Sequence, residues 1–425
     1  MFSKPNALIG ALLVAFSYAL PSPNSHVYDN GASYSSTPLP PSQDPFYTAP
    51  TGFEFKPPGT ILRLRRAPGN LTSVFGNCSS AYNILYRTTD SQYKPAWAVT
   101  TLYIPSIPNN GDALLSYQFP YNSVDADFSP SYSFYTEPSP DVTAGLSRGW
   151  FVSVPDYEGP LASDGAGILE AHSTIDSIRA VLFSNLGLSS DVRIALWGYS
   201  GGAIPSEWAL EFQEQYAPEL NISGAALGGL PPNVTDVIFN VIGTIWASHA
   251  MSASLGVLTQ YPAAYDFFVS KMKTEGPYNR TGFLTINNMS FAEAHVVFAG
   301  QNMFDYFDDG SEILQFPIIK TPFQENSVMT YHGVPRAPLF VYKAIHDEVT
   351  LVGDTDAFVA RNCLMGTNIL YQRNTVGEHL DEFTNGDGRA LDWLETVLDG
   401  SYAEKYSTEG CTVMNVTVNI VDSGT

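Results

Sequence analysis

Short apolar runs alternate with helix-like patterns along much of the chain. Runs rich in β-branched and aromatic residues are typical of strands, and they lie at residues 82–88, 97–104, 113–119, 149–154, 192–196, 222–230, 336–344 and 368–372, the last being the final strand that we predict. Helices are predicted at residues 168–186, 203–216 and 389–398. Strands that alternate with helices indicate an α/β fold, with a mostly parallel sheet covered by helices on both faces.

This alternation breaks between residues 233 and 321, where helical patterns mix with many aromatic residues and no clear strand occurs. We interpret this stretch as a helical cap, inserted into a core formed by residues 51–232 and 322–425. Because the insertion follows the strand at 222–230, it should leave the sheet at its carboxyl edge. Some large apolar side chains of the cap are therefore expected to line a channel there, while others form the cap's own core.

The first 50 residues lack the periodicity of the rest of the chain. A short basic start precedes an apolar run at residues 7–19, which is too short to cross a bilayer, and small residues suited to cleavage end that run. We interpret residues 1–20 as a secretory signal peptide and residues 21–50 as an N-terminal arm. The alternative for the apolar run is a membrane anchor. No second run of about twenty apolar residues occurs, so no transmembrane anchor is predicted.

The net charge of the chain excludes some classes of binding partner. The sequence has 20 Lys and Arg residues against 42 Asp and Glu residues, which gives a formal net charge of −22. Nucleic acid and anionic membrane surfaces repel such a chain, so no nucleic-acid partner is predicted. Hydrophobic residues make up 44% of the sequence, enough for a sizeable core.

Sequons and cysteines agree with passage through the secretory pathway. N-glycosylation sequons lie at Asn70, Asn77, Asn221, Asn233, Asn279, Asn288 and Asn415. Cys363 and Cys411 bracket the last part of the chain and can pair in an oxidising compartment. Cys78 is then either a buried free thiol, which we favour, or a partner in an intermolecular disulfide. We therefore expect a secreted, extracellular glycoprotein.

The sequence WGYSGG at residues 197–202 carries the clearest chemical signal. It lies between a predicted strand and a predicted helix, the context that the G-x-S-x-G motif requires. In that turn a serine adopts a strained backbone conformation that projects its hydroxyl above the sheet edge. We predict that Ser200 is a nucleophile and that the backbone N–H of Gly201 faces a developing oxyanion. The alternative is a Gly-rich turn with an ordinary serine.

A serine nucleophile needs a base and an acid at neighbouring strand ends, in the chain order Ser, acid, His. Asp347 follows the strand at 336–344 and is the predicted acid, and His379 follows the strand at 368–372 and is the predicted base. Neutral His379 would take the proton of Ser200, while Asp347 would orient the imidazole and stabilise its charged form. The alternatives nearby are Glu348, Asp354 and Asp356 for the acid and His346 for the base.

The loop at residues 119–123 follows an early strand and is expected to supply a second N–H to the oxyanion. We choose Asn122 for this role; the alternative is a plain loop at the edge of the sheet, since no HGGG motif occurs there. No cluster of His and Cys has the spacing of metal ligands, so no metal and no organic cofactor is predicted.

Several of these segments together resemble the fungal secretory lipase family, of the Candida antarctica lipase A type, which includes esterases of fungal metabolites such as trichothecene esterases. The segments are YRTTDS, LLSYQFPYNS, PDYEGP, IDSIRA, GYSGGA and GEHL, in this order within residues 53–411. The resemblance implies an α/β-hydrolase fold, a helical cap over the site and hydrolysis of acyl esters. It implies the triad Ser200, Asp347 and His379, and oxyanion donors at Gly201 and Asn122.

Two departures from the family pattern stand out. Relatives tend to carry Asp where this chain has Asn122, and Cys near Phe128. The first removes a carboxylate near the site and could alter the pH behaviour, and the second implies that one family disulfide is missing.

The leading hypothesis is a secreted serine ester hydrolase of lipase or esterase type, acting on an acylglycerol or an acylated small molecule, with a lipid interface as an open possibility. One alternative is an esterase that removes a short acyl group, such as acetyl, from a fungal metabolite. A non-catalytic α/β-hydrolase relative that only binds ligands is a second alternative, against which the complete set of Ser, Asp and His argues. A peptidase on the same scaffold is a further possibility.

Overall fold

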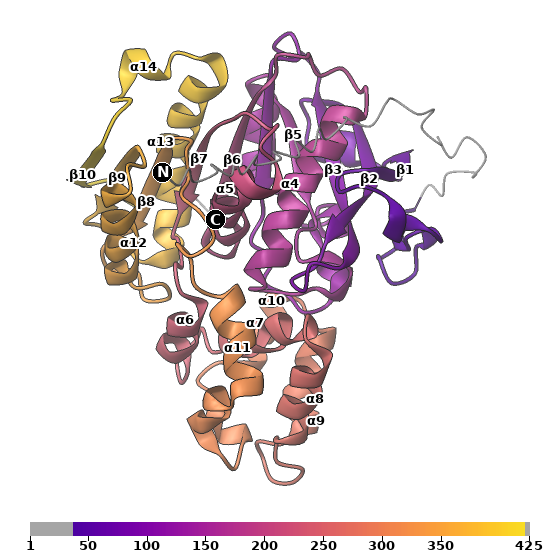
Figure 1. The fold of residues 1–425 in the computed structure, drawn as a ribbon, viewed down its shortest axis with the longest axis vertical. Coiled ribbons are helices and arrows are strands. Elements are labelled where there is room, and N and C mark those ends of the chain that lie inside the picture. Colours follow the sequence, from indigo (N-terminus) through magenta and orange to yellow (C-terminus); the bar gives the residue numbers. More distant parts are fainter. Residues whose placement is uncertain (1–36, 421–425) are drawn as a thin grey trace, which may run out of the picture.

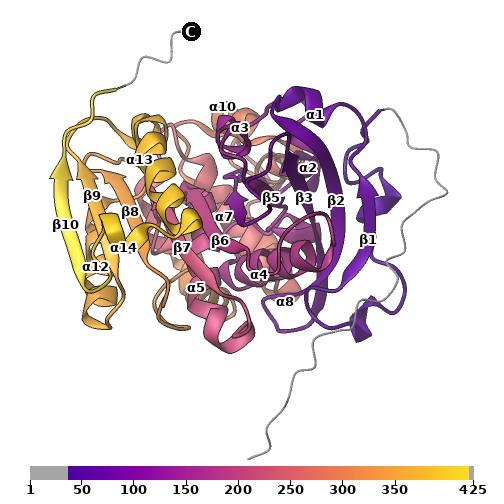
Figure 2. The same cartoon turned by 90° about the horizontal axis from the view of Figure 1, so that it is seen from above.

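A single sheet runs through the molecule. In this computed structural model, which describes residues 37–420, ten strands are joined in the order β1-β2-β3-β5-β4-β6-β7-β8-β9-β10 (Figures 1 and 2). The strands are β1 (Ile61–Arg66), β2 (Cys78–Thr89), β3 (Pro95–Pro105), β4 (Ala113–Gln118), β5 (Phe151–Pro155), β6 (Arg193–Tyr199), β7 (Ile222–Gly228), β8 (Leu339–Ala344), β9 (Ile369–Asn374) and β10 (Cys411–Val416). From β5 to β10 every neighbouring pair is parallel, whereas β1, β2, β3 and β5 pair antiparallel. The predicted mostly parallel α/β fold is confirmed.

Helices cover both faces of this sheet. The helices are α1 (Leu71–Val74), α2 (Pro130–Ser133), α3 (Pro140–Ser147), α4 (Gly167–Phe183), α5 (Ala203–Tyr216), α6 (Val234–Val241), α7 (Ser248–Thr259), α8 (Pro262–Ser270), α9 (Arg280–Phe283), α10 (Phe291–Phe298), α11 (Pro317–Asn326), α12 (Val352–Leu364), α13 (His379–Asp399) and α14 (Tyr402–Lys405). One face packs on α4, α5 and α12, and the other on α3 and α13 (Figure 2). Among the described residues, no helix combines the length and the apolar character needed to cross a membrane.

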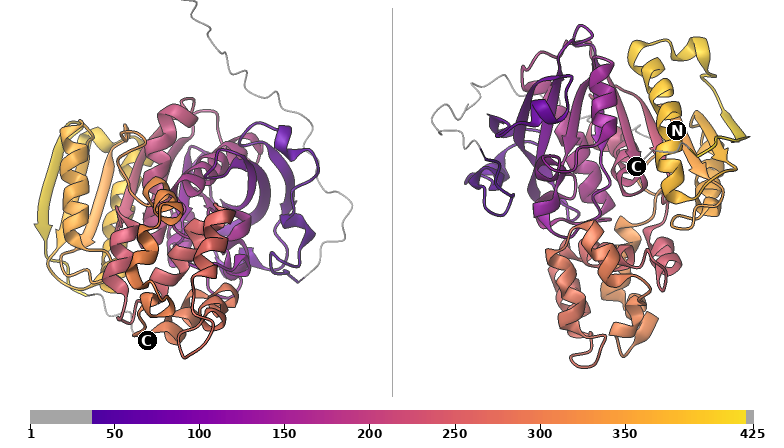
Figure 3. Two further views of the ribbon diagram at one scale, coloured as in Figure 1. Left: turned by 60° about the horizontal axis from the view of Figure 1, so that its bottom comes forward. Right: turned by 180° about the vertical axis from the view of Figure 1, so that it is seen from behind.

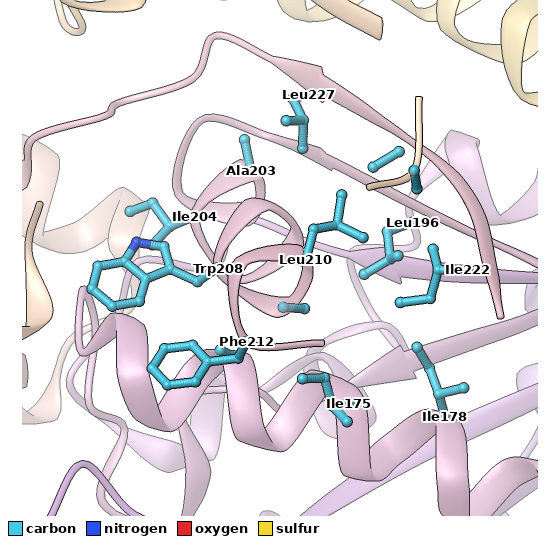
Figure 4. Close-up of a cluster of buried hydrophobic side chains, with 14 of the residues drawn as sticks. Ile175, Ile178, Leu196, Ala203, Ile204, Trp208, Leu210, Phe212, Ile222 and Leu227 are labelled. Carbon is cyan, nitrogen blue, oxygen red and sulfur yellow. The ribbon is translucent and has the colours of Figure 1, made fainter. Parts of the chain in front are cut away.

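The two cores follow from the alternation of side chains along each strand. In β6, Ile194 and Leu196 join the cluster beneath α4 and α5, while Ala195 and Trp197 join the cluster beneath α13. Figure 4 shows part of the first cluster, in which Trp208 of α5 lies beside Phe212, above the isoleucines of α4. A central parallel strand therefore reads as an unbroken apolar run, because both of its faces are buried.

The chain between β7 and β8 is helical. Helices α6 to α11 form a layer at the carboxyl edge of the sheet, seen at the bottom of Figure 1 and from two further sides in Figure 3. These helices share a hydrophobic cluster of their own, rich in Phe and Met side chains. Helix α11 packs against α7 and α8 and runs across residue 321, so the helical segment extends to Asn326.

The sequence pattern misses β1, α12 and β10, and the strand predicted as the last one is followed by β10. β10 pairs with β9 on one side only, and four of its six residues are exposed. It therefore lacks the apolar run by which a buried strand is recognised. Helix α13 begins at His379 rather than at residue 389, since Gly386 and Gly388 weaken its helical pattern.

The end of the predicted N-terminal arm belongs to the folded core. Phe46 is buried, the Asp44 carboxylate lies 2.7 Å from the Arg65 guanidinium, and the Trp97 indole donates to the Tyr47 carbonyl at 2.9 Å. The predicted signal peptide, and residues 21–36 of the arm, lie outside the described residues.

Candidate active site

Ser200 lies at the sharp turn between β6 and α5. Its φ is +52°, in the left-handed region that a residue with a side chain adopts only under strain. The glycines on either side make this turn possible. A Cβ on Gly198 would lie 2.0 Å from the Gly202 carbonyl oxygen, and one on Gly202 would lie 1.9 Å from that of Gln118. The Ser200 side chain is thus held at the carboxyl edge of the sheet, with 8% of its surface exposed.

The structure brings Ser200, His379 and Asp347 into one hydrogen-bonded chain. The Ser200 hydroxyl lies 2.9 Å from Nε2 of His379, and Nδ1 of the same ring lies 2.8 Å from Oδ2 of Asp347. Since a carboxylate only accepts, Nδ1 carries the proton and Nε2 is free to accept the serine proton. This is the arrangement that activates a serine hydroxyl by a general base.

Asp347 is held as a carboxylate. Its Oδ1 accepts from the backbone N–H groups of Val349 and Thr350, at 3.0 and 2.7 Å, and its Oδ2 lies 3.3 Å from the buried ammonium of Lys343. Burial alone would raise the pKa of Asp347, but Lys343 and His379 outweigh it and hold that pKa below its usual value. Nothing in the sequence marks Lys343 as functional, because a lysine on a predicted buried strand has no characteristic spacing to other residues of the site.

The residues considered as alternatives to Asp347 and His379 either lie away from Ser200 or make other contacts. His346 is exposed, and Asp356 bonds to Tyr371 and Arg373. Glu348 instead supports the histidine, since its carboxylate accepts from the backbone N–H of His379 and from the indole N–H of Trp246, both at 2.9 Å. Glu348 thus joins the histidine loop to the helical segment.

Gly201 and Asn122 lie next to Ser200. Both line the same cavity as the serine. The Asn122 side chain covers Gly201 so closely that a Cβ on Gly201 would meet Asn122 Oδ1 at 2.0 Å. Asn122 has a φ of +44°, which an asparagine tolerates better than most residues.

The cavity beside Ser200 is small and mostly apolar. It measures about 40 Å³, and the residues that line it are Asn122, Asp164, Gly165, Ser200, Gly201, Ile204, Pro231, Val234, Val237, Ile238, His249, Ala253, Val349 and Thr350. Burial lowers the pKa of His249 to about 4, and the nearby His379 ring contributes to this lowering because two positive charges there would repel. His249 Nδ1 donates to the Trp246 carbonyl at 3.1 Å, so the neutral ring presents Nε2 as an acceptor.

The structure also shows where the predicted disulfide, the remaining cysteine and the glycosylation sequons lie. Cys363 of α12 and Cys411 of β10 form a disulfide, with Cα atoms 5.9 Å apart, and Cys78 is a buried free thiol. Of the sequon asparagines, Asn70, Asn77, Asn221, Asn288 and Asn415 are exposed. Asn233 and Asn279 are half-buried, and the side chain of each caps a helix.

Comparison with known proteins adds to this geometry. The secretory lipase family model matches residues 140–405. The trichothecene C-3 esterase of Fusarium sporotrichioides is 48% identical over 91% of this chain and 90% of its own length. Lipase A of Arthroderma benhamiae is 33% identical over 91% of this chain and 85% of its own.

Among solved structures, Candida antarctica lipase A in its closed state superposes with a TM-score of 0.81 at 26% identity, covering 90% of this chain and 91% of that one. The fold is therefore that of an α/β-hydrolase, and the relatives given above are named as an esterase and as lipases. With the family model matched over more than half of its length, this chain belongs to the secretory lipase family and is a serine carboxylic-ester hydrolase.

Proposed function

We propose that this enzyme uses Ser200, His379 and Asp347 as its catalytic triad and removes a short acyl group from an acylated small molecule. The observation that carries the proposal is the hydrogen-bonded chain of these three side chains beside a cavity of about 40 Å³. Gly201 and Asn122 are the proposed oxyanion donors.

The chemistry follows from the positions of the protons. The Ser200 oxygen attacks the ester carbonyl carbon while its proton passes to Nε2 of His379. The carbonyl oxygen becomes negative and is stabilised by the backbone N–H groups of Gly201 and Asn122. When the tetrahedral intermediate collapses, the alcohol leaves with the proton from His379, and the acyl group stays on Ser200. Water then repeats the sequence and releases the carboxylic acid. Asp347 keeps the imidazole oriented throughout.

Cavity size supports a short acyl group. A space of about 40 Å³ holds about three water-sized groups. An acetyl group has three heavy atoms, so it fits this space, whereas a long acyl chain needs the surrounding helices to move. The 48% identity with a relative named trichothecene C-3 esterase supports an acylated fungal metabolite as substrate class.

A lipase that acts at a lipid surface is the second candidate. Large apolar side chains are exposed on the helical segment, at Phe239, Ile245, Val296 and Val297, with 43%, 59%, 77% and 47% of their surface exposed. Such side chains would suit contact with a lipid–water interface. This candidate requires the helical segment to act as a movable cap over Ser200, and it predicts higher activity on dispersed lipid than on dissolved esters.

Secretion and glycosylation complete the proposal. The family of secretory lipases, the disulfide and the exposed sequon asparagines support export through an oxidising compartment. We expect glycans first at the five exposed asparagines, because Asn233 and Asn279 use their amide groups to cap helices.

The test compares hydrolysis of p-nitrophenyl acetate, butyrate and palmitate with hydrolysis of an acetylated sesquiterpenoid polyol and of emulsified triacylglycerol. The proposal expects kcat/KM to fall from acetate to palmitate, and the acetylated polyol to be a good substrate. Preference for palmitate or triacylglycerol would establish the lipase instead. A lack of activity on every ester, with binding retained, would indicate a non-catalytic relative, and cleavage of peptides alone would indicate a peptidase.

A further inference from the structure

Three carboxylates converge beneath the wall of the Ser200 cavity, outside the triad. Glu158 follows β5, Asp164 lies in the next loop, and Glu170 lies in the first turn of α4. Their exposed fractions are 0%, 7% and 1%. One oxygen from each lies within 4.8 Å of the oxygens of the other two. Burial and the charges of the neighbouring acids raise the pKa of Glu158 and of Glu170 well above its usual value, so the three groups can be ionised together only where positive charge is supplied.

The protein itself supplies little compensation. Neither carboxylate oxygen of Glu158, nor Oε2 of Glu170, has a hydrogen-bond partner. Oε1 of Glu170 accepts from the Gly165 N–H at 2.8 Å. Within residues 37–420, no ion pair joins any of the three carboxylates to Lys, Arg or His.

The remaining polar groups around the cluster are weak donors or further acids. The Tyr121 hydroxyl lies beside Glu158, although its oxygen also accepts from the Glu158 backbone N–H at 2.9 Å. The Ser252 hydroxyl of α7 lies beside Asp164. Asp156 adds a further negative charge near Glu158. The oxygens of Glu158 therefore lie close to the other two carboxylates, and no cationic side chain in the described part of the chain pairs with them.

Other buried acidic residues of this protein lie in pairs that can avoid two adjacent negative charges by sharing a proton. The Asp141 side chain lies against that of Asp387, and Glu207 lies against Glu211, so each pair can share a proton. The three carboxylates near Ser200 act on one another by charge, and no hydrogen bond joins Asp164 or Glu170 to Glu158. Their oxygens converge without contact, which is the spacing of ligands around an ion.

We propose that Glu158, Asp164 and Glu170 bind one Ca²⁺ ion. Carboxylate oxygens are the ligands that Ca²⁺ prefers, at about 2.3–2.6 Å, so oxygens on opposite sides of the ion lie about 4.6–5.2 Å apart. The three oxygens, all within 4.8 Å of one another, fit around such an ion, and Mg²⁺ is disfavoured because it keeps several of its waters and is seldom held by a cage of protein ligands alone. A dication would leave the cluster with a single net negative charge.

The ion would fasten the wall of the cavity to the helical segment. Asp164 and Gly165 line the Ser200 cavity. Helix α7 packs so tightly on this loop that a Cβ on Gly256 would lie 2.3 Å from the Asp164 carbonyl oxygen. A Ca²⁺ ion held by Glu158 and Glu170 of the core would therefore fix the position of Asp164. It would also fix the loop on which α7 packs. The site stabilises the fold and takes no part in the ester chemistry.

The test uses the full-length secreted protein. After chelation with EDTA and dialysis, the melting temperature is measured against Ca²⁺ concentration, and bound metal is counted by mass spectrometry after equilibrium dialysis. We expect one tightly held Ca²⁺ per chain and a rise in melting temperature of about 3–8 °C at saturation. Mg²⁺ at the same concentration should raise the melting temperature far less, and the Ca²⁺ effect should shrink at pH 5, where protons compete for the carboxylates.

A pair of matched variants separates this site from the many acids on the surface. Glu170→Gln should lose the stoichiometric Ca²⁺ and keep less than about 1 °C of the Ca²⁺-induced rise. Glu207→Gln, an equally buried glutamate of a proton-sharing pair, should keep both. If either variant fails to fold, the measurements on the wild-type protein decide alone.

Two results would overturn the proposal. One is a chelated wild-type protein that shows no stoichiometric Ca²⁺ and no Ca²⁺-dependent change in melting temperature. The other is a Ca²⁺ effect that Glu170→Gln retains in full. In the first case, stabilisation of the chelated protein by acid would assign the cluster to shared protons.

Discussion

The sheet core and the helical segment between β7 and β8 are built on different rules. In the core, each side chain near the reaction is held by hydrogen bonds to strand ends and loops, as Asp347 is by Val349, Thr350 and Lys343. The helical segment instead closes around a cluster of its own. It meets the loop after β8 through a few polar contacts, namely Trp246 to Glu348 and Asn240 to the carbonyls of Glu348 and Val349.

This difference suggests a division of roles: the core carries the groups that react, and the helical segment shapes the cavity that selects among esters. The proposed nucleophile, base and acid all come from the core, whereas Val237, Ile238, His249 and Ala253 of the cavity come from α6 and α7. Changes in the core should therefore alter the rate of every ester alike, and changes in the segment should alter the ranking of esters. Four experiments test that separation and a fifth tests the buried acids of the core, and they follow from the largest expected effect to the smallest.

Ser200→Ala should abolish hydrolysis of all esters and leave the melting temperature near that of the wild type. Loss of a catalytic serine costs about 10⁴–10⁶-fold in turnover, because the attacking oxygen is gone. Hydrolysis of p-nitrophenyl acetate and a thermal melt are the two measurements. Near wild-type turnover would mean that the nucleophile lies elsewhere.

Removal of the disulfide should weaken the core edge. Replacing Cys363 and Cys411 by Ser frees a loop of 48 residues, which costs about 2–4 kcal/mol of unfolding free energy. Denaturant unfolding measures this cost. The ranking of acetate and butyrate should stay the same, since the bridge joins α12 to β10, away from the cavity. A changed ranking would contradict the separation of the two regions.

Lys343→Met should narrow the pH range of activity. The ammonium of Lys343 holds the pKa of Asp347 below its usual value, so its removal raises that pKa. The stabilising, ionised form of Asp347 is then lost at a higher pH as acid is added. We expect the profile of melting temperature against pH to fall off at a higher pH on the acid side, and the activity on all esters to be lost with the fold there. Lys271→Met, which breaks a partly exposed ion pair with Asp309 far from the triad in the sequence, is the control and should not move the profile.

Val237→Ala should change the ranking of esters. Val237 of α6 lines the cavity, and truncating it makes room for a longer acyl group. The ratio of butyrate to acetate kcat/KM should rise roughly three- to ten-fold, in the range of one methylene. Val296→Ala removes the same atoms from the exposed side of α10 and should leave the ratio unchanged. Equal ratios in the two variants would refute a role of α6 in selectivity.

Asp387→Asn should flatten the dependence of stability on pH. Burial and the charge of Asp141 raise the pKa of Asp387 to about 9. The folded state therefore keeps a proton that the unfolded chain releases above about pH 4, so stability falls as the pH rises from about 4 towards 9. A neutral Asn removes this loss. Melts at pH 6 and pH 8.5 should differ less in the variant than in the wild type, by roughly 1–3 °C.

The sequence pattern predicted some strands and helices and missed others, and the physical reason is how far each element is buried or interrupted by glycine. Buried parallel strands such as β6 were found because apolar runs mark strands that are covered on both faces. The edge strand β10 was missed because it is half exposed and has one partner. Helix α13 was found only in its second half, where no glycine interrupts the pattern.

Some features of the candidate active site could likewise be predicted from the sequence, whereas others could not. The sequence by itself determined the elbow around Ser200, since a strand, a glycine-rich turn and a helix are local features, and it placed Asp347 and His379 after the right strands, since chain order fixes strand ends. The tertiary structure alone decided that Lys343 pairs with Asp347, that Glu348 joins His379 to Trp246, and that Glu158, Asp164 and Glu170 converge. These relations depend on the direction of side chains after packing, and no spacing along the chain encodes that direction.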